Sequence, residues 1–120
     1  MSRGKQYQVQ VIPEHFSIHL GRKPSHVEAC RSITKHFERD GYEVDTNVEY
    51  KLGELDVVVN YTEDYIAILE FKENSHEKSL EKSLGQLVRA YWYFTSFGYK
   101  VDLYQVFGKK NGVYGNKLVA

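Results

Sequence analysis

The sequence predicts one α/β domain in which two helices flank a central β-sheet, with the element order αβββαβ after an N-terminal β-hairpin. Its 120 residues suffice for one compact domain and are too few for two. Residues 54–60 and 65–72 are apolar on both faces, as central strands are. Two other segments have helical apolar spacing. We therefore divide the chain into a hairpin extension, residues 1–24, and a core, residues 25–120.

The hairpin is predicted from alternation near the N-terminus. Apolar and polar side chains alternate at residues 7–11 and again at 16–20, and Pro13-Glu14 lies between the two runs. Strict alternation is typical of a half-buried strand, and a proline favours the turn.

The first core helix has a recognisable beginning and end. Ser25 followed by Glu28 forms a capping-box pattern, and Gly41 is suited to end the helix. We expect its buried stripe to consist of Val27, Cys30, Ile33 and Phe37.

Three strands are expected next. Residues 42–50 are largely polar and indicate an edge strand, after which Gly53 permits a turn. The two central strands, 54–60 and 65–72, follow one another through a short turn, 61–64, and form a hairpin.

The second helix begins at the capping residue Ser75 and ends before Gly98. Strands are expected at residues 99–107 and 113–119. The core stripe of the helix is expected to consist of Leu80, Leu84, Leu87, Tyr91 and Phe94.

Composition excludes several classes of protein. Cys30 is the single cysteine, so an internal disulfide or a zinc ribbon is excluded, which suits a reducing cytoplasm. No run approaches the roughly 20 apolar residues of a membrane helix, so we expect a soluble protein without membrane contact. The formal net charge is zero and neither supports nor excludes nucleic-acid binding.

Two carboxylates should meet on the central strands. Alternation places Asp56 on the face of Val58 and places Glu70 and Lys72 on one face of the next strand. A hairpin centred near Glu63 pairs Asp56 directly with Glu70, at about 5 Å.

Such a carboxylate pair repels itself in a desolvated position unless a cation lies between the two groups. Mg²⁺, or Mn²⁺, suits oxygen ligands of this kind, and the Phe71 carbonyl can supply a further oxygen. Lys72, two residues along the strand, can orient the attacking water or offset phosphorane charge. The set predicts phosphodiester hydrolysis.

These residues carry a family resemblance. Gly53-Glu-Leu-Asp56, thirteen intervening residues and Glu70-Phe-Lys72 resemble the PD-(D/E)xK superfamily, including archaeal Holliday junction resolvases and RecB-like nucleases. Leu55 replaces the proline that names the motif. The resemblance implies a restriction-endonuclease-like core with a central mixed β-sheet, a Mg²⁺-dependent deoxyribonuclease activity, Asp56 and Glu70 as metal ligands, and Lys72 as the catalytic lysine. The structural alternative is a surface ion pair between Glu70 and Lys72, with Asp56 as a polar strand-start residue.

Two accessory residues follow from the resemblance and keep a structural alternative. Glu28 stands where resolvases place a metal-ligating glutamate on the first helix, but the capping box explains it too, and it lies opposite the apolar stripe. Gln86 resembles the glutamine on the second core helix of RecB-like nucleases. The tyrosine of those nucleases comes four residues later, where this chain has Ala90 and then Tyr91.

A polar face of the second helix is a candidate DNA contact. It combines residues at helical spacing: Lys82, Gln86, Arg89 and Tyr93. Lys109 and Lys110, in an expected turn, are further candidates for phosphate contact. A solvated helix face and a soluble turn explain the same residues equally well.

The remaining polar and aromatic clusters receive a structural interpretation. The five histidines form no zinc pattern, and we interpret His15, His19, His26, His36 and His76 as ordinary surface or structural residues. The aromatic run at residues 91–94 is assigned to the core and to a dimer contact.

Two functions remain open from the sequence. The first is a divalent-metal-dependent DNA endonuclease, acting on junctions, ends or flaps, that works as a homodimer. The second is a nucleic-acid-binding or assembly protein that keeps the fold without turnover.

Overall fold

The chain folds as a six-stranded sheet with two helices in the computed structural model, which describes residues 10–74 and 76–118. The predicted order of helices and strands in the core is confirmed. The elements are β1 (His15–His19), α1 (His26–Arg39), β2 (Glu43–Tyr50), β3 (Gly53–Thr62), β4 (Tyr65–Lys72), α2 (Glu77–Ser96), β5 (Lys100–Lys109) and β6 (Gly112–Leu118).

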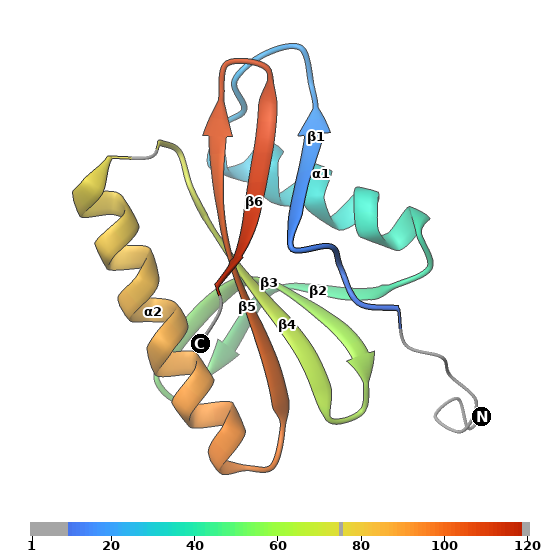
Figure 1. Cartoon of the computed structure of the whole chain (residues 1–120), viewed down its shortest axis with the longest axis vertical. Helices are drawn as coiled ribbons and strands as arrows, with labels where there is room; N and C mark the ends of the chain where they lie inside the picture. Colours follow the sequence, from blue (N-terminus) through green and yellow to red (C-terminus); the bar gives the residue numbers. More distant parts are fainter. Residues whose placement is uncertain (1–9, 75, 119–120) are drawn as a thin grey trace.

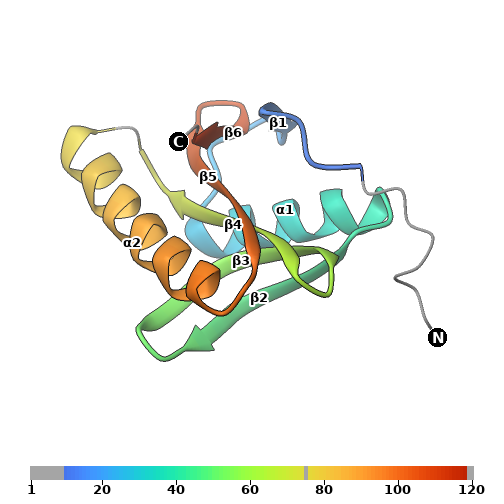
Figure 2. The same ribbon diagram turned by 60° about the horizontal axis from the view of Figure 1, so that its bottom comes forward.

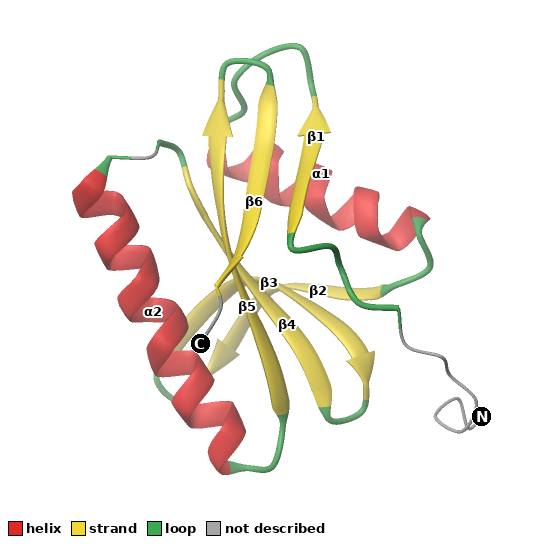
Figure 3. Ribbon diagram, in the orientation of Figure 1, coloured by secondary structure: helices red, strands yellow, loops and turns green. Residues whose placement is uncertain are grey.

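The sheet is mixed, with the strand order β1-β6-β5-β4-β3-β2 (Figures 1 and 3). Among the strand pairs of the described residues, β4 and β5 alone run parallel, because α2 carries the chain from the end of β4 back to the start of β5. The helices α1 and α2 cover opposite faces of the sheet (Figure 2). This architecture is that of a restriction-endonuclease-like core.

The strand predicted at residues 16–20 is present as β1, but its partner is β6. Gln10 and Val11 form no strand, and residues 7–9 of the expected hairpin lie outside the described residues. Alternation of apolar and polar residues indicates a strand but not the strand with which it pairs. One edge of β6 pairs with β5, and its other edge is free to pair with β1. The strand β1 of the predicted extension is therefore part of the core sheet.

The helix α1 begins with the predicted capping box. Ser25 Oγ accepts a hydrogen bond from the Glu28 backbone N–H at 3.2 Å, and Glu28 Oε1 accepts one from the Ser25 N–H at 3.0 Å. The predicted apolar stripe is wrong at one end, because Val27 is 64% exposed and Cys30 is half-buried. The buried positions recur every four residues: Ala29, Ile33 and Phe37.

The strands β3 and β4 form the centre of the core, as predicted. In β4 the side chains alternate between two apolar clusters. The cluster on the α1 side includes Ala67, Leu69 and Phe71, whereas Ile66 and Ile68 belong to the cluster on the α2 side. Burial on both faces explains why this strand is apolar until its charged end.

The helix α2 packs on the sheet with most of the predicted stripe, because Leu87 is buried and Tyr91 and Phe94 pack against the same apolar cluster. Its buried residues are Ser83, Leu87 and Ala90, and Leu84 is 43% exposed. Gly98 follows the C-cap with φ of 91°, as predicted for a helix end, while the expected cap Ser75 lies outside the described residues.

No helix among the described residues is both long and apolar enough to span a membrane. The homodimer stays a prediction. Three apolar residues on α2 are exposed and could contact a second copy of the chain: Leu84, Val88 and Trp92.

Gly112 is required where β6 approaches β1. A Cβ at this position would lie 2.0 Å from the Ile18 carbonyl oxygen, so the paired backbones would have to separate. We expect Gly112→Ala to lower the free energy of unfolding by roughly 1–3 kcal/mol in urea titrations. Gly85→Ala is the matched control, because outside the adjoining helix backbone nothing lies within 4 Å of its added Cβ. On helix propensity it should raise stability by roughly 0.5–1 kcal/mol. Unchanged stability of Gly112→Ala would show that the strands relax freely.

Candidate active site

Asp56 and Glu70 meet where the β3–β4 ladder ends. The last pair is Val57 with Leu69, and the same register continued by one residue sets Asp56 opposite Glu70, as predicted. Beyond this pair, hydrogen bonds from backbone N–H groups to side-chain carboxylates replace the backbone–backbone bonds of the ladder. Glu70 Oε1 accepts a hydrogen bond from the Asp56 N–H, and Asp56 Oδ2 accepts one from the Phe71 N–H, both at 2.9 Å. Each carboxylate is thus fixed by the opposite strand.

The alternation of β3 breaks at Asp56. Leu55 packs in the cluster on the α2 side, whereas Val57 packs on the α1 side, although regular alternation would place both on one face. Across from Asp56, Asn47 of β2 has φ of 51°, a left-handed conformation that Asn tolerates better than most residues. Because the alternation breaks here, the Asp56 carboxylate faces α1, whereas Val58 packs on the α2 side. The prediction that Asp56 shares the face of Val58 is therefore wrong.

Two residues of α1 complete that side of the site. His26 Nε2 lies 3.2 Å from Asp56 Oδ1, and the His26 ring centroid lies 5.6 Å from that of Phe71. Cys30 follows His26 by one helical turn, and ligand atoms of His26, Cys30 and Asp56 all lie within 4.8 Å of one another. The interpretation of His26 as an ordinary surface or structural residue did not include this contact with Asp56. The available signal was the four-residue spacing at a helix start that the capping box defines.

Burial makes Glu70 difficult to ionise in the metal-free protein. Its side chain is 2% exposed, and desolvation, then the charge of Asp56, raises its pKa to about 7. The Asp56 N–H hydrogen bond and the charge of Lys72 oppose this rise in pKa. Burial, with the charges of Asp56 and Glu70, also raises the pKa of the Cys30 thiol to about 12. The alternative of a surface ion pair fails for Glu70, because the carboxylate is buried.

The α2 side of the site is aromatic and basic. Tyr50 of β2 packs against Tyr93, with ring centroids 5.0 Å apart. Burial raises the pKa of Tyr50, the charge of Arg89 lowers it, and the charge of Glu70 raises it. The side chains of Arg89 and Glu70 therefore both lie within electrostatic range of Tyr50. The structure therefore brings two of the four predicted α2 residues, Arg89 and Tyr93, to the Glu70 side of the site.

The described geometry agrees with a comparison against known families. A model described as the PD-(D/E)XK nuclease superfamily matches residues 30–107. The chain belongs to this superfamily. The matched segment contains Asp56, Glu70 and Lys72, and membership supports a nuclease-type function. No curated protein matches the chain. The narrower resemblance to Holliday junction resolvases and RecB-like nucleases stays a prediction.

The accessory residues of this PD-(D/E)XK protein are placed unevenly. Lys82 is exposed, whereas Gln86 is half-buried, and its Oε1 finds no hydrogen-bond partner within the described part of the chain. Lys109 and Lys110 lie in or beside the β5–β6 turn, where the Lys109 ammonium lies 5.3 Å from the centroid of the Phe107 ring. A DNA-contact role for these residues stays a prediction.

Glu28 has a structural partner on each side. Besides the capping box, its carboxylate forms an ion pair with Arg22. The hydrogen bond from the Ser25 backbone, followed by the Arg22 interaction, lowers the pKa of Glu28. It does not belong to the group formed by His26, Cys30 and Asp56. These contacts explain Glu28 as a helix cap, and its role as a metal ligand stays a prediction.

The donor set suits the divalent metals that PD-(D/E)XK nucleases generally use. Asp56 and Glu70 offer carboxylate oxygens from adjacent strands, and the buried Glu70 resists carrying its charge beside Asp56. A cation between the two groups relieves both the repulsion and the loss of solvation. The residues present therefore fit a divalent ion that prefers oxygen ligands.

Proposed function

We propose that this protein is a divalent-metal-dependent endonuclease that hydrolyses phosphodiester bonds in DNA. The observation that supports it best is the carboxylate pair formed by the buried Glu70 and the partly buried Asp56, with Lys72 two residues further along β4. Membership of the PD-(D/E)XK superfamily supports the same chemistry. An active nuclease explains why charged groups stand at the end of a strand that is otherwise apolar on both faces.

Asp56, Glu70 and the Phe71 carbonyl are the proposed ligands of Mg²⁺ or Mn²⁺. When bound, the ion supplies Lewis-acid activation and lowers the pKa of its water. The Phe71 N–H and the His26 ring hold the Asp56 carboxylate in place, and the Asp56 N–H holds that of Glu70. Lys72 brings an ammonium group to this strand end, where it orients the attacking water or offsets the negative charge of the transition state.

The DNA backbone is proposed to lie along the basic side of α2. Arg89, within electrostatic range of Tyr50, is proposed to contact a phosphate near the scissile one, and Lys82 lies about two helical turns away on the same helix. Tyr93 packs on Tyr50 and presents an aromatic surface for a base or sugar. Gln86, with its unpartnered amide oxygen, and the turn residues Lys109 and Lys110 complete the proposed contacts.

The test is cleavage of linear duplex, single-stranded, supercoiled and four-way-junction DNA with Mg²⁺, with Mn²⁺ and with a chelator. We expect metal-dependent cleavage, including nicking of the supercoiled circle, which has no ends. Lys72→Met should lower the cleavage rate about 10²-fold by removing one positive group from the transition state. Lys78→Met, an exposed lysine at the start of α2, is the matched control and should cleave at the wild-type rate.

Two outcomes contradict the proposal. A folded protein that binds DNA but cuts none of the substrates with either metal would support the alternative, a nucleic-acid-binding or assembly protein without turnover. Cleavage that persists in excess chelator would remove the metal from the mechanism.

A further inference from the structure

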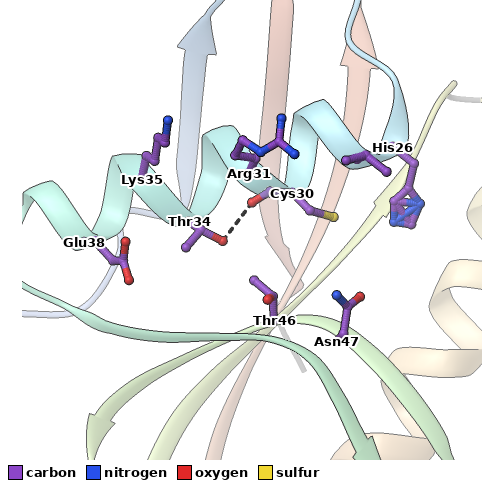
Figure 4. A pocket seen from close by; sticks show the side chains of 9 residues that line it. His26, Cys30, Arg31, Thr34, Lys35, Glu38, Thr46 and Asn47 are labelled. Carbon is purple, nitrogen blue, oxygen red and sulfur yellow. Dashed lines mark hydrogen bonds between the residues drawn. The ribbon is translucent and has the colours of Figure 1, made fainter.

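A second set of metal-ligating side chains lies beside the proposed catalytic pair. His26 and Cys30 extend from the first two turns of α1, and Asp56 reaches them from β3. Their ligand atoms lie within 4.8 Å of one another, and His26 Nε2 and Asp56 Oδ1 are 3.2 Å apart. Figure 4 shows His26 and Cys30 on the side of α1 that faces Thr46 and Asn47 of β2. Three different ligand types thus converge from two elements.

The chemistry of this set differs from that of the carboxylate pair. Thiolate and imidazole are ligands of Zn²⁺ and similar ions, whereas Mg²⁺ prefers oxygen alone. Three protein ligands also leave the fourth position of a tetrahedral ion for water or a phosphate oxygen. Asp56 is the one residue that both sets require, so a single carboxylate cannot serve both ions in the same way.

Two of the three ligands line a cleft that opens to solvent, and the third is already oriented by a backbone hydrogen bond. His26 and Cys30 line a cleft of about 590 Å³ between α1 and β2, which also includes Thr34. The Asp56 carboxylate is already oriented by the Phe71 N–H, and the Phe71 ring packs near that of His26. An ion entering from solvent therefore meets ligands that one helix and one strand already hold together.

We propose that His26, Cys30 and Asp56 bind a Zn²⁺-class ion, and that this ion silences the nuclease by engaging Asp56. On binding, the Cys30 thiol gives its proton to solvent and its sulfur bonds the ion as thiolate. The binding half of the proposal stands on the geometry of the three ligands. The silencing half rests on the proposed function of Asp56.

Binding is tested first without any activity measurement. Metal-free protein is titrated with Co²⁺, which substitutes for Zn²⁺ and gives a thiolate-to-metal charge-transfer absorption, and Zn²⁺ is then added to displace it. Because Cys30 is the single cysteine, any such band in this chain reports on Cys30. We expect one equivalent of Co²⁺ to produce the band and Zn²⁺ to remove it. Absence of the band in the wild-type protein overturns the proposal.

Variants identify the other ligands. His26→Ala should weaken Co²⁺ binding at least tenfold, and because this side chain is 47% exposed, the variant should keep the fold. His36→Ala, on the same helix but outside the three-residue group, is the matched control and should bind as the wild type does. Equal affinity in His26→Ala and the wild type contradicts the site. Cys30→Ser should lose the band while its circular dichroism stays unchanged.

The silencing half has its own readout. With Mg²⁺ present, one equivalent of Zn²⁺ should stop DNA cleavage by the wild type but not by Cys30→Ser. Continued wild-type cleavage while the absorption experiment shows a filled site contradicts silencing. A protein that cleaves nothing with any metal contradicts the proposed nuclease function instead, and the Zn²⁺ site is then judged by absorption alone.

Discussion

Replacing Asp56 by Asn should lower the rate of DNA cleavage about 10³-fold or more at saturating Mg²⁺. Asn keeps the shape of the side chain and one oxygen that can accept the Phe71 N–H, so the strand junction should survive. It removes the negative charge that the cation and its bound water require. Metal ions contribute several kcal/mol to such transition states, and each 1.36 kcal/mol corresponds to a factor of ten in rate.

The matched control is Asp45→Asn on the neighbouring strand β2. Asp45 is exposed and accepts a hydrogen bond from Asn60 Nδ2 at 3.0 Å, so the control removes a carboxylate of the same sheet without entering the site. It should cleave like the wild type. A titration with Mg²⁺ should also show that Asp56→Asn needs a higher concentration for its residual activity. Retention of a tenth or more of wild-type activity would mean that Asp56 is not a metal ligand.

Local sequence patterns were sufficient to predict the centre of this fold. The apolar runs of β3 and β4 are buried on both faces, and the short turn between them determines their register, so the pairing of Asp56 with Glu70 follows from the amino-acid pattern. The capping box at Ser25 and the left-handed Gly98 define helix ends for the same reason. In each case the determining contacts lie within a few residues along the chain or across one hairpin.

The errors concern contacts between distant segments. The strand β1 pairs with β6, about a hundred residues away, and alternation carries no information about that choice. Leu84 and Val27 match a helical stripe, yet which side of a helix is buried depends on how the sheet twists beneath it.

The contact between His26 and Asp56 was not predicted for the same reason. Asp56 is 30 positions away from His26, and the carboxylate faces α1 only because the alternation of β3 breaks there. Accessory residues of an active site are therefore harder to predict than its central pair.

Replacing Glu70 by Gln should stabilise the metal-free protein, and the gain should grow with pH. The pKa of Glu70 is raised from its ordinary 4.5 to about 7 in the fold, chiefly by burial and then by Asp56. The folded chain therefore retains a proton that the unfolded chain gives up. The stability that this retained proton contributes is complete below about pH 4.5 and is lost as the pH rises through 7. Gln stays neutral throughout and can still accept the Asp56 N–H.

The expected difference is measured by urea unfolding in chelator at several pH values. Near pH 4 Glu70→Gln and the wild type should have similar free energies of unfolding, and above pH 8 the variant should be more stable by about 3 kcal/mol. Mg²⁺ should narrow the gap at high pH, because the ion stabilises only the charged pair of the wild type. Glu63→Gln, in the exposed β3–β4 turn, should show no such dependence. Equal stability of Glu70→Gln and the wild type at pH 9 without metal would mean that the fold tolerates the buried Glu70 charge without a cation. The electrostatic reason for a metal ion at this site would then be removed.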